Sequence, residues 1–145
     1  MDEVSDSLVA LCQLIRRRTH PVRRGEMTPE QFWLLHRLER RGPLSIGRLA
    51  EELGVSQSSV TVSCQRLERM GWLRRRRLSS DERVVEVELT GEGGERLASW
   101  REARRRLVAE LLEPLADGER AELGRLLRRV LAAAGGEEGM GDGTD

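Results

Sequence analysis

Four consecutive arginines, Arg74–Arg77, stand directly before a polar turn and an alternating segment. The turn is predicted over Ser79–Arg83, and Val85–Leu89 then alternates apolar and acidic residues. Period-two alternation beside a polar turn is typical of a β-hairpin. The pattern constrains the fold strongly, because residues 56–71 directly before the hairpin have the spacing and the closing glycine of a helix. The chain therefore places a basic hairpin immediately behind a helix.

Two short capped helices are predicted before this hairpin. Ser45 can cap the first and Ser56 the second, because a serine hydroxyl accepts an N–H that the first turn of a helix leaves free. Gly54 separates the helices and favours the left-handed conformation that ends the first one. Two helices joined by such a turn form a helix-turn-helix. The residues expected to face the core are Ile46, Leu49, Ala50, Leu53, Val60, Cys64, Leu67 and Met70.

A hairpin behind a helix-turn-helix is a wing, and a basic wing is suited to DNA phosphates. The second helix also has a polar face, on which Gln57 could read adenine through two hydrogen bonds. Ser58 and Thr61 suit phosphate contacts, while Val62 is either a contact for a thymine methyl group or an ordinary surface valine. The predicted DNA-binding residues of the helices and the first wing strand are Ser45, Ser56, Gln57, Ser58, Thr61, Val62, Gln65, Arg66, Arg74, Arg75, Arg76 and Arg77.

The distribution of charge supports this interpretation although the net charge is zero, from 25 arginines and 25 acids without any lysine. Residues 56–83 hold seven arginines against three acids, a net charge of +4. Residues 107–145 hold four arginines against nine acids, a net charge of −5. A basic middle and an acidic end indicate one face for nucleic acid and another turned away from it. The alternative is an ordinary solvated surface in an arginine-rich chain.

The expected fold is mainly α with a small β-wing (α+β), a winged helix-turn-helix with flanking dimerisation helices. We expect one domain over residues 1–134, with the DNA-binding core at 45–90 and a disordered, glycine-rich acidic tail at 135–145. The helices within 1–20 and 91–134 have apolar stripes that find no partner within one subunit. Their expected partner is a second copy of the chain. The starts of two helices before and after the core are predicted at Thr28, with Pro29 and Gln31, and at Thr90.

Several classes of protein are excluded by what the sequence lacks. No apolar run approaches the roughly 20 residues that span a bilayer, and the acidic start differs from a signal peptide, so we expect a cytoplasmic protein with no membrane partner. Two cysteines and two histidines have no metal-ligand spacing. Neither a phosphate-binding glycine loop nor a nucleophile elbow is present. We therefore expect no metal, no cofactor and no enzymatic activity.

Residues 27–93 resemble the MarR family of winged-helix regulators. The resemblance covers about half of the chain and rests on the joint spacing of many short motifs. The sequence departs from the family at Val62 and Ser63, where a basic and an apolar residue are more common. The matching residues are Met27, Thr28, Gln31, Gly42, Pro43, Leu44, Ser45, Leu49, Ala50, Val55, Ser56, Ser58, Val60, Thr61, Arg66, Leu67, Glu68, Gly71, Arg75, Asp81, Arg83, Leu89, Thr90 and Gly93.

The resemblance implies a homodimer that binds a palindromic operator in double-stranded DNA, usually as a repressor released by a small ligand or by oxidation. It also implies that Arg83 enters the minor groove at the wing tip. By the same resemblance, Asp81 would brace the wing, with Arg75 as its expected partner, rather than touch DNA.

Two switches remain open at this stage, beside a DNA-binding protein with no effector. In the first, Trp33, His36 and Trp100 bind a small aromatic anion, because aromatic rings with a polar tip suit such a ligand. Those three residues could equally be core and surface filler. In the second, Cys12 is a redox sensor. Cys12 lies on an apolar helix face, where an inert buried thiol is the usual state, so the ligand switch is preferred.

Overall fold

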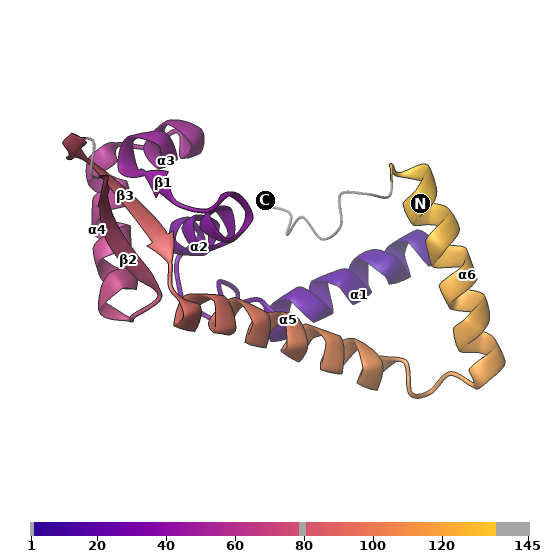
Figure 1. The fold of residues 1–145 in the computed structure, drawn as a ribbon. Helices are drawn as coiled ribbons and strands as arrows, with labels where there is room; N and C mark the ends of the chain where they lie inside the picture. Colours follow the sequence, from indigo (N-terminus) through magenta and orange to yellow (C-terminus); the bar gives the residue numbers. More distant parts are fainter. Residues whose placement is uncertain (1, 79–80, 136–145) are drawn as a thin grey trace. The chain divides into compact units, whose positions relative to one another are not determined.

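A computed structural model of the chain describes residues 2–78 and 81–135; the side chains of residues 78 and 81–83 lie outside this description. Contacts divide the chain into two compact units, Met1–Arg104 and Arg105–Asp145. The elements, labelled in Figure 1, are α1 Glu3–Thr19, α2 Pro29–Arg41, β1 Leu44–Ser45, α3 Ile46–Leu53, α4 Gln57–Arg69, β2 Leu73–Leu78, β3 Asp81–Leu89, α5 Gly91–Leu111 and α6 Asp117–Ala133. The expected mainly helical fold with a small sheet is confirmed. The predicted disordered tail lies, except for Gly135, outside the described residues.

The predicted helix starts are each stabilised by capping hydrogen bonds. At the start of α2, Thr28 Oγ1 accepts from the Gln31 N–H at 3.1 Å, and Gln31 Oε1 accepts from the Thr28 N–H at 3.1 Å. Ser45 and Ser56 each accept a backbone N–H three residues later, also at 3.1 Å. Gly54 ends α3 with a φ of +75°, a left-handed conformation that favours glycine. Local chemistry in the sequence therefore sets the boundaries of α2, α3 and α4.

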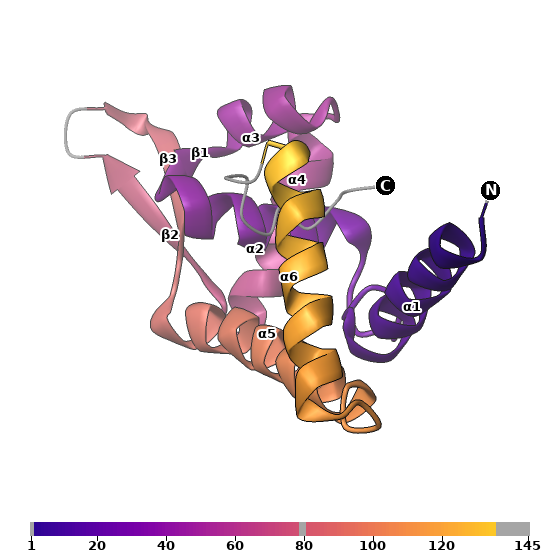
Figure 2. The same ribbon diagram turned by 90° about the vertical axis from the view of Figure 1, so that its right-hand side faces the viewer.

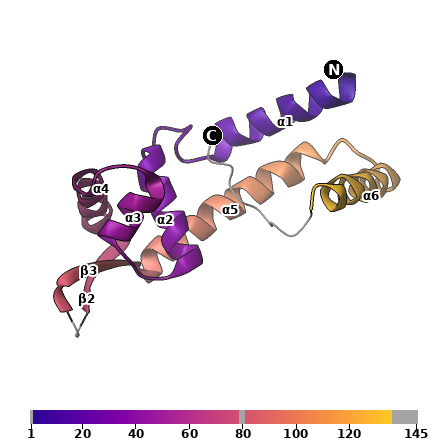
Figure 3. The same cartoon turned by 90° about the horizontal axis from the view of Figure 1, so that it is seen from above.

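The main core lies in the first unit, between α2, α3, α4, the sheet and the start of α5 (Figure 3). Leu34, which the sequence analysis did not select, is fully buried. Met70 corrects another expectation, because it is 42% exposed. α4 ends at Arg69, so Met70 is its C-cap and no longer lies in the buried stripe. The buried apolar residues are Met27, Phe32, Leu34, Leu35, Leu38, Leu49, Ala50, Val60, Cys64, Leu67, Leu73, Val87 and Leu97.

The hairpin forms part of a three-stranded antiparallel sheet with the order β1-β3-β2. The short strand β1 was not predicted; it pairs Leu44 with Val87. The turn was predicted over 79–83, but residues 81–83 already belong to β3, and residues 79 and 80 lie outside the described residues. The pairing is irregular there, since Arg77 pairs with Val85 but Leu78 pairs with Asp81. The far halves of β2 and β3 extend beyond the neighbouring helices of the first unit (Figure 2).

The base of the hairpin is fixed to the start of α5. Thr90 Oγ1 accepts from the Gly93 N–H at 3.0 Å and donates to the Gly71 carbonyl at 2.6 Å. The Thr90 N–H also donates to the Trp72 carbonyl at 3.0 Å. A Cβ at position 93 would lie 2.3 Å from that same carbonyl oxygen, so only glycine fits. These hydrogen bonds therefore hold the base of the wing and the first turn of α5 together.

Several large apolar side chains remain exposed on each of two helices, α1 in the first unit and α6 in the second. On α1 they include Val4, which is 75% exposed, and on α6 they include Val130 and Leu131, which are 59% and 61% exposed. None of the residues of α6 is buried. The exposed apolar residues of these helices are Val4, Leu8, Val9, Leu11, Leu126, Leu127, Val130 and Leu131.

Candidate nucleic-acid interface

Helix α4 has one face in the core and one face in solvent. Val60, Cys64 and Leu67 are buried on the inner face. On the outer face Val62 is 50% exposed, and Thr61 is half-buried. The other predicted contact residues on the exposed face are Gln57, Ser58, Gln65 and Arg66. The helix therefore presents its polar side chains as one continuous surface, as the sequence predicted.

The start of α4 is attached to α2 by a contact that the sequence analysis missed. The Ser59 hydroxyl donates to the Glu30 carboxylate and lies 3.1 Å from both of its oxygens. Glu30 and Ser59 are 29 residues apart, and nothing in local spacing signals their pairing. This hydrogen bond holds the first turns of α2 and α4 together. The orientation of the exposed face of α4 thus depends partly on α2.

A groove of about 690 Å³ runs between the start of α2 and the exposed face of α4. It brings together three of the predicted contact residues, Ser58, Val62 and Arg66. Ser63 is buried at the edge of the same groove. The groove is lined by Thr28, Pro29, Glu30, Gln31, Ser58, Ser59, Val62, Ser63 and Arg66.

The four arginines of β2 lie on two faces of the hairpin. Directly paired residues of an antiparallel sheet point to the same side. Arg74 pairs in register with Glu88, and Arg76 with Glu86, so these arginines share a face with acids. Both also form ion pairs with Glu88, at 2.8 Å from Arg74 and 3.7 Å from Arg76. The positive charge of this face is therefore partly neutralised.

The opposite face of the hairpin carries the other two arginines. Arg75 pairs in register with Val87 and Arg77 with Val85. Arg75 Nε lies 3.0 Å from Glu68 Oε2 on α4, so this face is the one that meets α4. Among the described residues, no acid forms an ion pair with Arg77, which is exposed. A second hollow, of about 580 Å³, joins α4 to the wing and is lined by Gln65, Glu68, Arg69 and Arg75.

The wing-tip predictions lie partly outside the described residues. The backbones of Asp81 and Arg83 belong to β3, in its irregular stretch beside the turn. Their side chains are not described, so minor-groove entry by Arg83 and bracing by Asp81 stay predictions. The described partner of Arg75 is Glu68. The described ion pair of Arg75 therefore joins the wing to α4.

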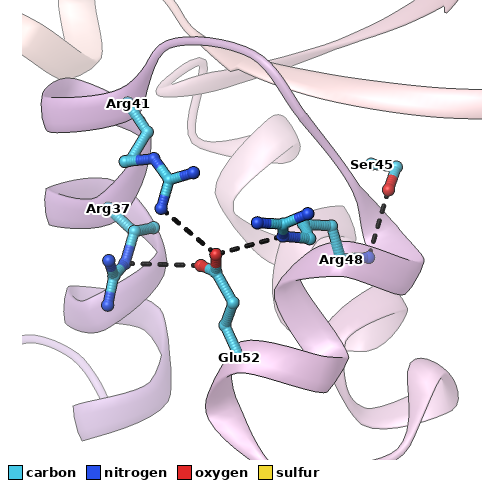
Figure 4. A network of polar contacts seen from close by, with 5 residues as sticks. All are labelled: Arg37, Arg41, Ser45, Arg48 and Glu52. Atoms are coloured by element: carbon cyan, nitrogen blue, oxygen red, sulfur yellow. Dashed lines mark hydrogen bonds and ion pairs between the residues drawn. The ribbon is translucent and has the colours of Figure 1, made fainter.

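Ser45 acts as a cap and lies beside a cluster of charged residues that the sequence analysis did not identify (Figure 4). Its hydroxyl accepts the Arg48 N–H and is half-buried. Glu52 of α3 accepts from Arg48 and Arg41 at 3.2 Å each and lies 3.6 Å from Arg37. The hydrogen bond from Arg48, together with the charges of these arginines, lowers the pKa of Glu52. This cluster ties α3 to α2.

The three predicted ligand residues have different surroundings. The ring of Phe32 lies 6.2 Å from His36 and 6.1 Å from Trp100, so these two residues belong to one aromatic cluster. Trp33 instead lies under the Arg37 guanidinium, at 5.0 Å. Arg96 lies over the rings of Trp72 and Trp100, at 5.7 and 5.3 Å, a cation that the sequence analysis missed. His36 and Trp100 are thus brought together around Phe32.

The two cysteines differ in exposure. Cys12 is exposed in the single chain, so the buried state expected for it would require a covering partner. Cys64 is buried in α4, and burial raises the pKa of its thiol from 9.0 to about 11.

None of the helices within residues 2–78 and 81–135 combines the length and the apolar character that a membrane span requires. The same part of the chain holds no cluster of three metal-ligating side chains.

Comparison with known proteins places this geometry in a family. The MarR family model matches residues 27–85. The HTH-type transcriptional repressor MdtR of Bacillus subtilis is 28% identical over 139 residues, which are 95% of this chain and 90% of MdtR. The crystal structure of the transcriptional regulator Tm0710 from Thermotoga maritima is 26% identical, with a TM-score of 0.75 over 90% of this chain and 92% of that one.

A third comparison concerns the fold alone. A mutant of MepR from S. aureus, solved bound to an oligodeoxyribonucleotide, has a TM-score of 0.75 at 18% identity over 92% of this chain and 99% of its own. The family model matches most of the segment whose motif spacing carries the resemblance, residues 27–93. The relatives are regulators rather than enzymes. By the family-model match and by these relatives, the chain is similar to the MarR family of winged helix-turn-helix transcriptional regulators.

Proposed function

We propose that the protein is a homodimeric, cytoplasmic repressor that binds a palindromic operator through α4 and the wing. The observation that carries the proposal is the exposed polar face of α4, next to the hairpin face that bears Arg75 and Arg77. A helix of this kind reads base edges in the major groove, and arginines of the wing contact phosphates. The name of MdtR, a repressor, and the oligonucleotide bound to the MepR mutant support the same proposal.

Dimerisation is proposed because the apolar side chains of α1 and α6 stay exposed in the single chain. A second copy would remove these surfaces from water, which is the main favourable term in association. Two copies related by a twofold axis could place their α4 helices about 34 Å apart, one turn of DNA, which suits a palindrome.

Sedimentation of a truncated chain tests the dimer. Ending the chain after Leu111 removes α6, and we expect a monomer or an aggregate. The control is a chain that ends after Gly135 and keeps α6, for which we expect the dimer of the full chain. A well-folded dimer that survives removal of α6 would contradict the proposed role of this helix.

The division of labour at the DNA is tested by two substitutions. Gln57→Ala should cost roughly 1–3 kcal/mol on the operator and little on random DNA, because a bidentate base contact is lost. Arg77→Ala should instead weaken both DNAs alike, because phosphate contacts carry no sequence information. Binding is measured over a range of salt concentrations on both DNAs. Equal losses on the two DNAs for Gln57→Ala would remove the base-reading assignment.

We further propose that a small aromatic anion releases the repressor, with Trp33, His36 and Trp100 as the ligand-binding residues. The shared cluster of His36, Phe32 and Trp100 supports this choice for two of them. The Arg96 guanidinium lies beside Trp100, and it also forms an ion pair with Glu26 at 3.7 Å. Such a ligand releases DNA only if it prefers the conformation that does not bind the operator.

A ligand switch and a redox switch are separated by parallel assays. Under the ligand proposal, aromatic anions raise the melting temperature. At 100 times its dissociation constant, such a ligand adds about 2.7 kcal/mol to the free energy of unfolding. Trp100→Ala should keep operator binding but lose this response, while Cys12→Ser should behave as the unmodified chain under peroxide. The exposed thiol of Cys12 keeps the redox alternative open. That alternative replaces the ligand switch if Cys12→Ser abolishes an oxidant response and no anion quenches tryptophan fluorescence.

A further inference from the structure

The side-chain amide of Gln57 lies close to Gly47 of α3. A Cβ added to Gly47 would lie 3.3 Å from Gln57 Nε2 and 3.9 Å from Gln57 Cδ. The first distance is shorter than a comfortable contact, so the Gln57 amide would have to move by a few tenths of an ångström. The amide of the proposed base-reading residue therefore lies where a side chain at position 47 would crowd it.

The backbone gives no other reason for a glycine at this position. Gly42 and Gly54 have positive φ angles, of +78° and +75°, whereas Gly47 has none. Gly47 is the second residue of α3, and glycine in a helix is unfavourable relative to alanine. The open space under Gln57 is the structural feature that distinguishes this glycine.

The position of the Gln57 amide matters because reading a base through two hydrogen bonds has narrow tolerances. Both donor–acceptor distances must fall within about 2.7–3.2 Å, so one displacement weakens both hydrogen bonds together. Glutamine also loses much rotamer freedom when it is fixed. A side chain at position 47 would crowd the amide and so change which rotamers are open to it before DNA binds.

We infer that Gly47 is a positioning residue for sequence recognition, which seats the Gln57 amide for base reading and so sets the specificity of α4. The inference rests on the base-reading role proposed for Gln57. Gly47 itself need not touch DNA. Its contribution is the absence of a side chain at the point where α3 supports the start of α4.

The test uses the full-length protein and the DNA sequence that it enriches from random duplexes. Gly47→Ala, Gln57→Ala and the double variant are compared for the ratio of affinities on that sequence and on random DNA. Gly118→Ala is the matched control, because Gly118 is also the second residue of its helix, α6, and a Cβ there meets nothing within 4 Å. Thermal unfolding of each variant is measured in parallel.

We expect Gly47→Ala to lower the affinity ratio roughly 3- to 10-fold, a part of what loss of a bidentate contact costs. Its melting temperature should stay equal or rise, because alanine favours the helix. A merely structural glycine would not combine unchanged stability with lost discrimination. In the Gln57→Ala background the second substitution should change nothing, and Gly118→Ala should leave the ratio unchanged.

Two results overturn the inference while leaving the proposed function intact. One is an unchanged ratio in Gly47→Ala when Gln57→Ala lowers it, and the other is a loss that adds fully to that of Gln57→Ala. If Gln57→Ala itself leaves the ratio unchanged, both the base-reading assignment and the inference fail. Failure of the unmodified chain to enrich any sequence would reject the proposed function instead.

Discussion

The segment from α2 to the start of α5 and the helix α6 contain equally regular apolar stripes, but only the first buries them. Leu35 is fully buried between neighbouring elements, whereas Leu131 is 61% exposed. The difference teaches that periodicity predicts which face of a helix is apolar and leaves its partner unspecified. Where several elements follow each other closely in sequence, as from Pro29 to Leu89, the partner lies in the same chain.

The same comparison separates two functions. The segment that closes its own core carries α4 and the wing, so the surface proposed to read DNA has an internally fixed geometry. The apolar surfaces of α1 and α6 stay exposed in the single chain, and the partner proposed for them is a second copy. In such a dimer, α1 and α6 set the spacing of the two α4 helices. A ligand could then change spacing without disturbing the reading surface.

The largest effect is expected from the same substitution made in the two regions. Leu35→Ala should destabilise the protein by about 2–5 kcal/mol, because it leaves a cavity in a closed core. Leu131→Ala removes the same atoms from an exposed position and should cost much less within one chain. Denaturant unfolding at several protein concentrations measures both losses. The Leu35→Ala loss should not depend on concentration. The Leu131→Ala loss should shrink on dilution if α6 is part of a dimer, because both chains then lose the stability that dimerisation adds.

The next effect is expected from charges placed on α6. Leu127→Glu together with Leu131→Glu should weaken the dimer roughly 100-fold, about 3 kcal/mol, because an unpaired charge would be buried at the interface. Circular dichroism should change little, since neither residue is buried in the single chain. Sedimentation measures the dimer, and Arg120→Glu on the same helix, outside the apolar residues, is a charge control. Unaltered dimerisation in the double variant would show that this face of α6 is not part of the dimer interface.

Much of the first unit could be predicted from local chemistry in the sequence. Thr28, Ser45, Ser56 and Gly54 act within three or four residues of their own position, so spacing alone revealed the helix boundaries. Strand β1 could not be found this way, because two residues have no recognisable period and pair only once β3 is in place. Met70 was assigned to the core because α4 was expected to include it, whereas the helix ends one residue earlier, at Arg69.

The candidate site was predictable in composition but less so in geometry. The exposed face of α4 follows from helical periodicity, and the basic wing strand follows from Arg74–Arg77. The contacts Ser59–Glu30 and Gln57–Gly47 depend on tertiary packing, so no local pattern signals them. The register of β2 with β3 also divides the four arginines between two faces, which a run of identical residues cannot reveal.

That division leads to a smaller, graded prediction for the wing. Arg77→Ala should lower the slope of log affinity against log salt by about one unit, because one phosphate contact is lost. Arg74→Ala should lower it by less, since Arg74 already shares Glu88 with Arg76. Binding to random DNA at several salt concentrations measures both slopes. Equal slopes for the two variants would show that the two faces of the hairpin contribute alike.

The smallest effect is expected for the two cysteines, one exposed on α1 and one buried in α4. At pH 8 an alkylating reagent should label Cys12 and spare Cys64 in the folded monomer, because burial raises the Cys64 pKa to about 11. Both thiols should react in denaturant, as quantified by mass spectrometry.

The same pKa shift predicts how stability responds to alkaline pH. Below pH 9 the Cys64 thiol is protonated in the folded and the unfolded chain, so the thiol adds no pH dependence. Between pH 9 and about 11 the unfolded chain loses the proton while the folded chain keeps it, so stability falls as pH rises. Cys64→Ala should lack this part of the alkaline loss, whereas Cys12→Ala should retain it. Denaturant unfolding from pH 8 to 11 compares the two variants, and parallel curves for both would mean that the Cys64 thiol is not held in its neutral form by the core.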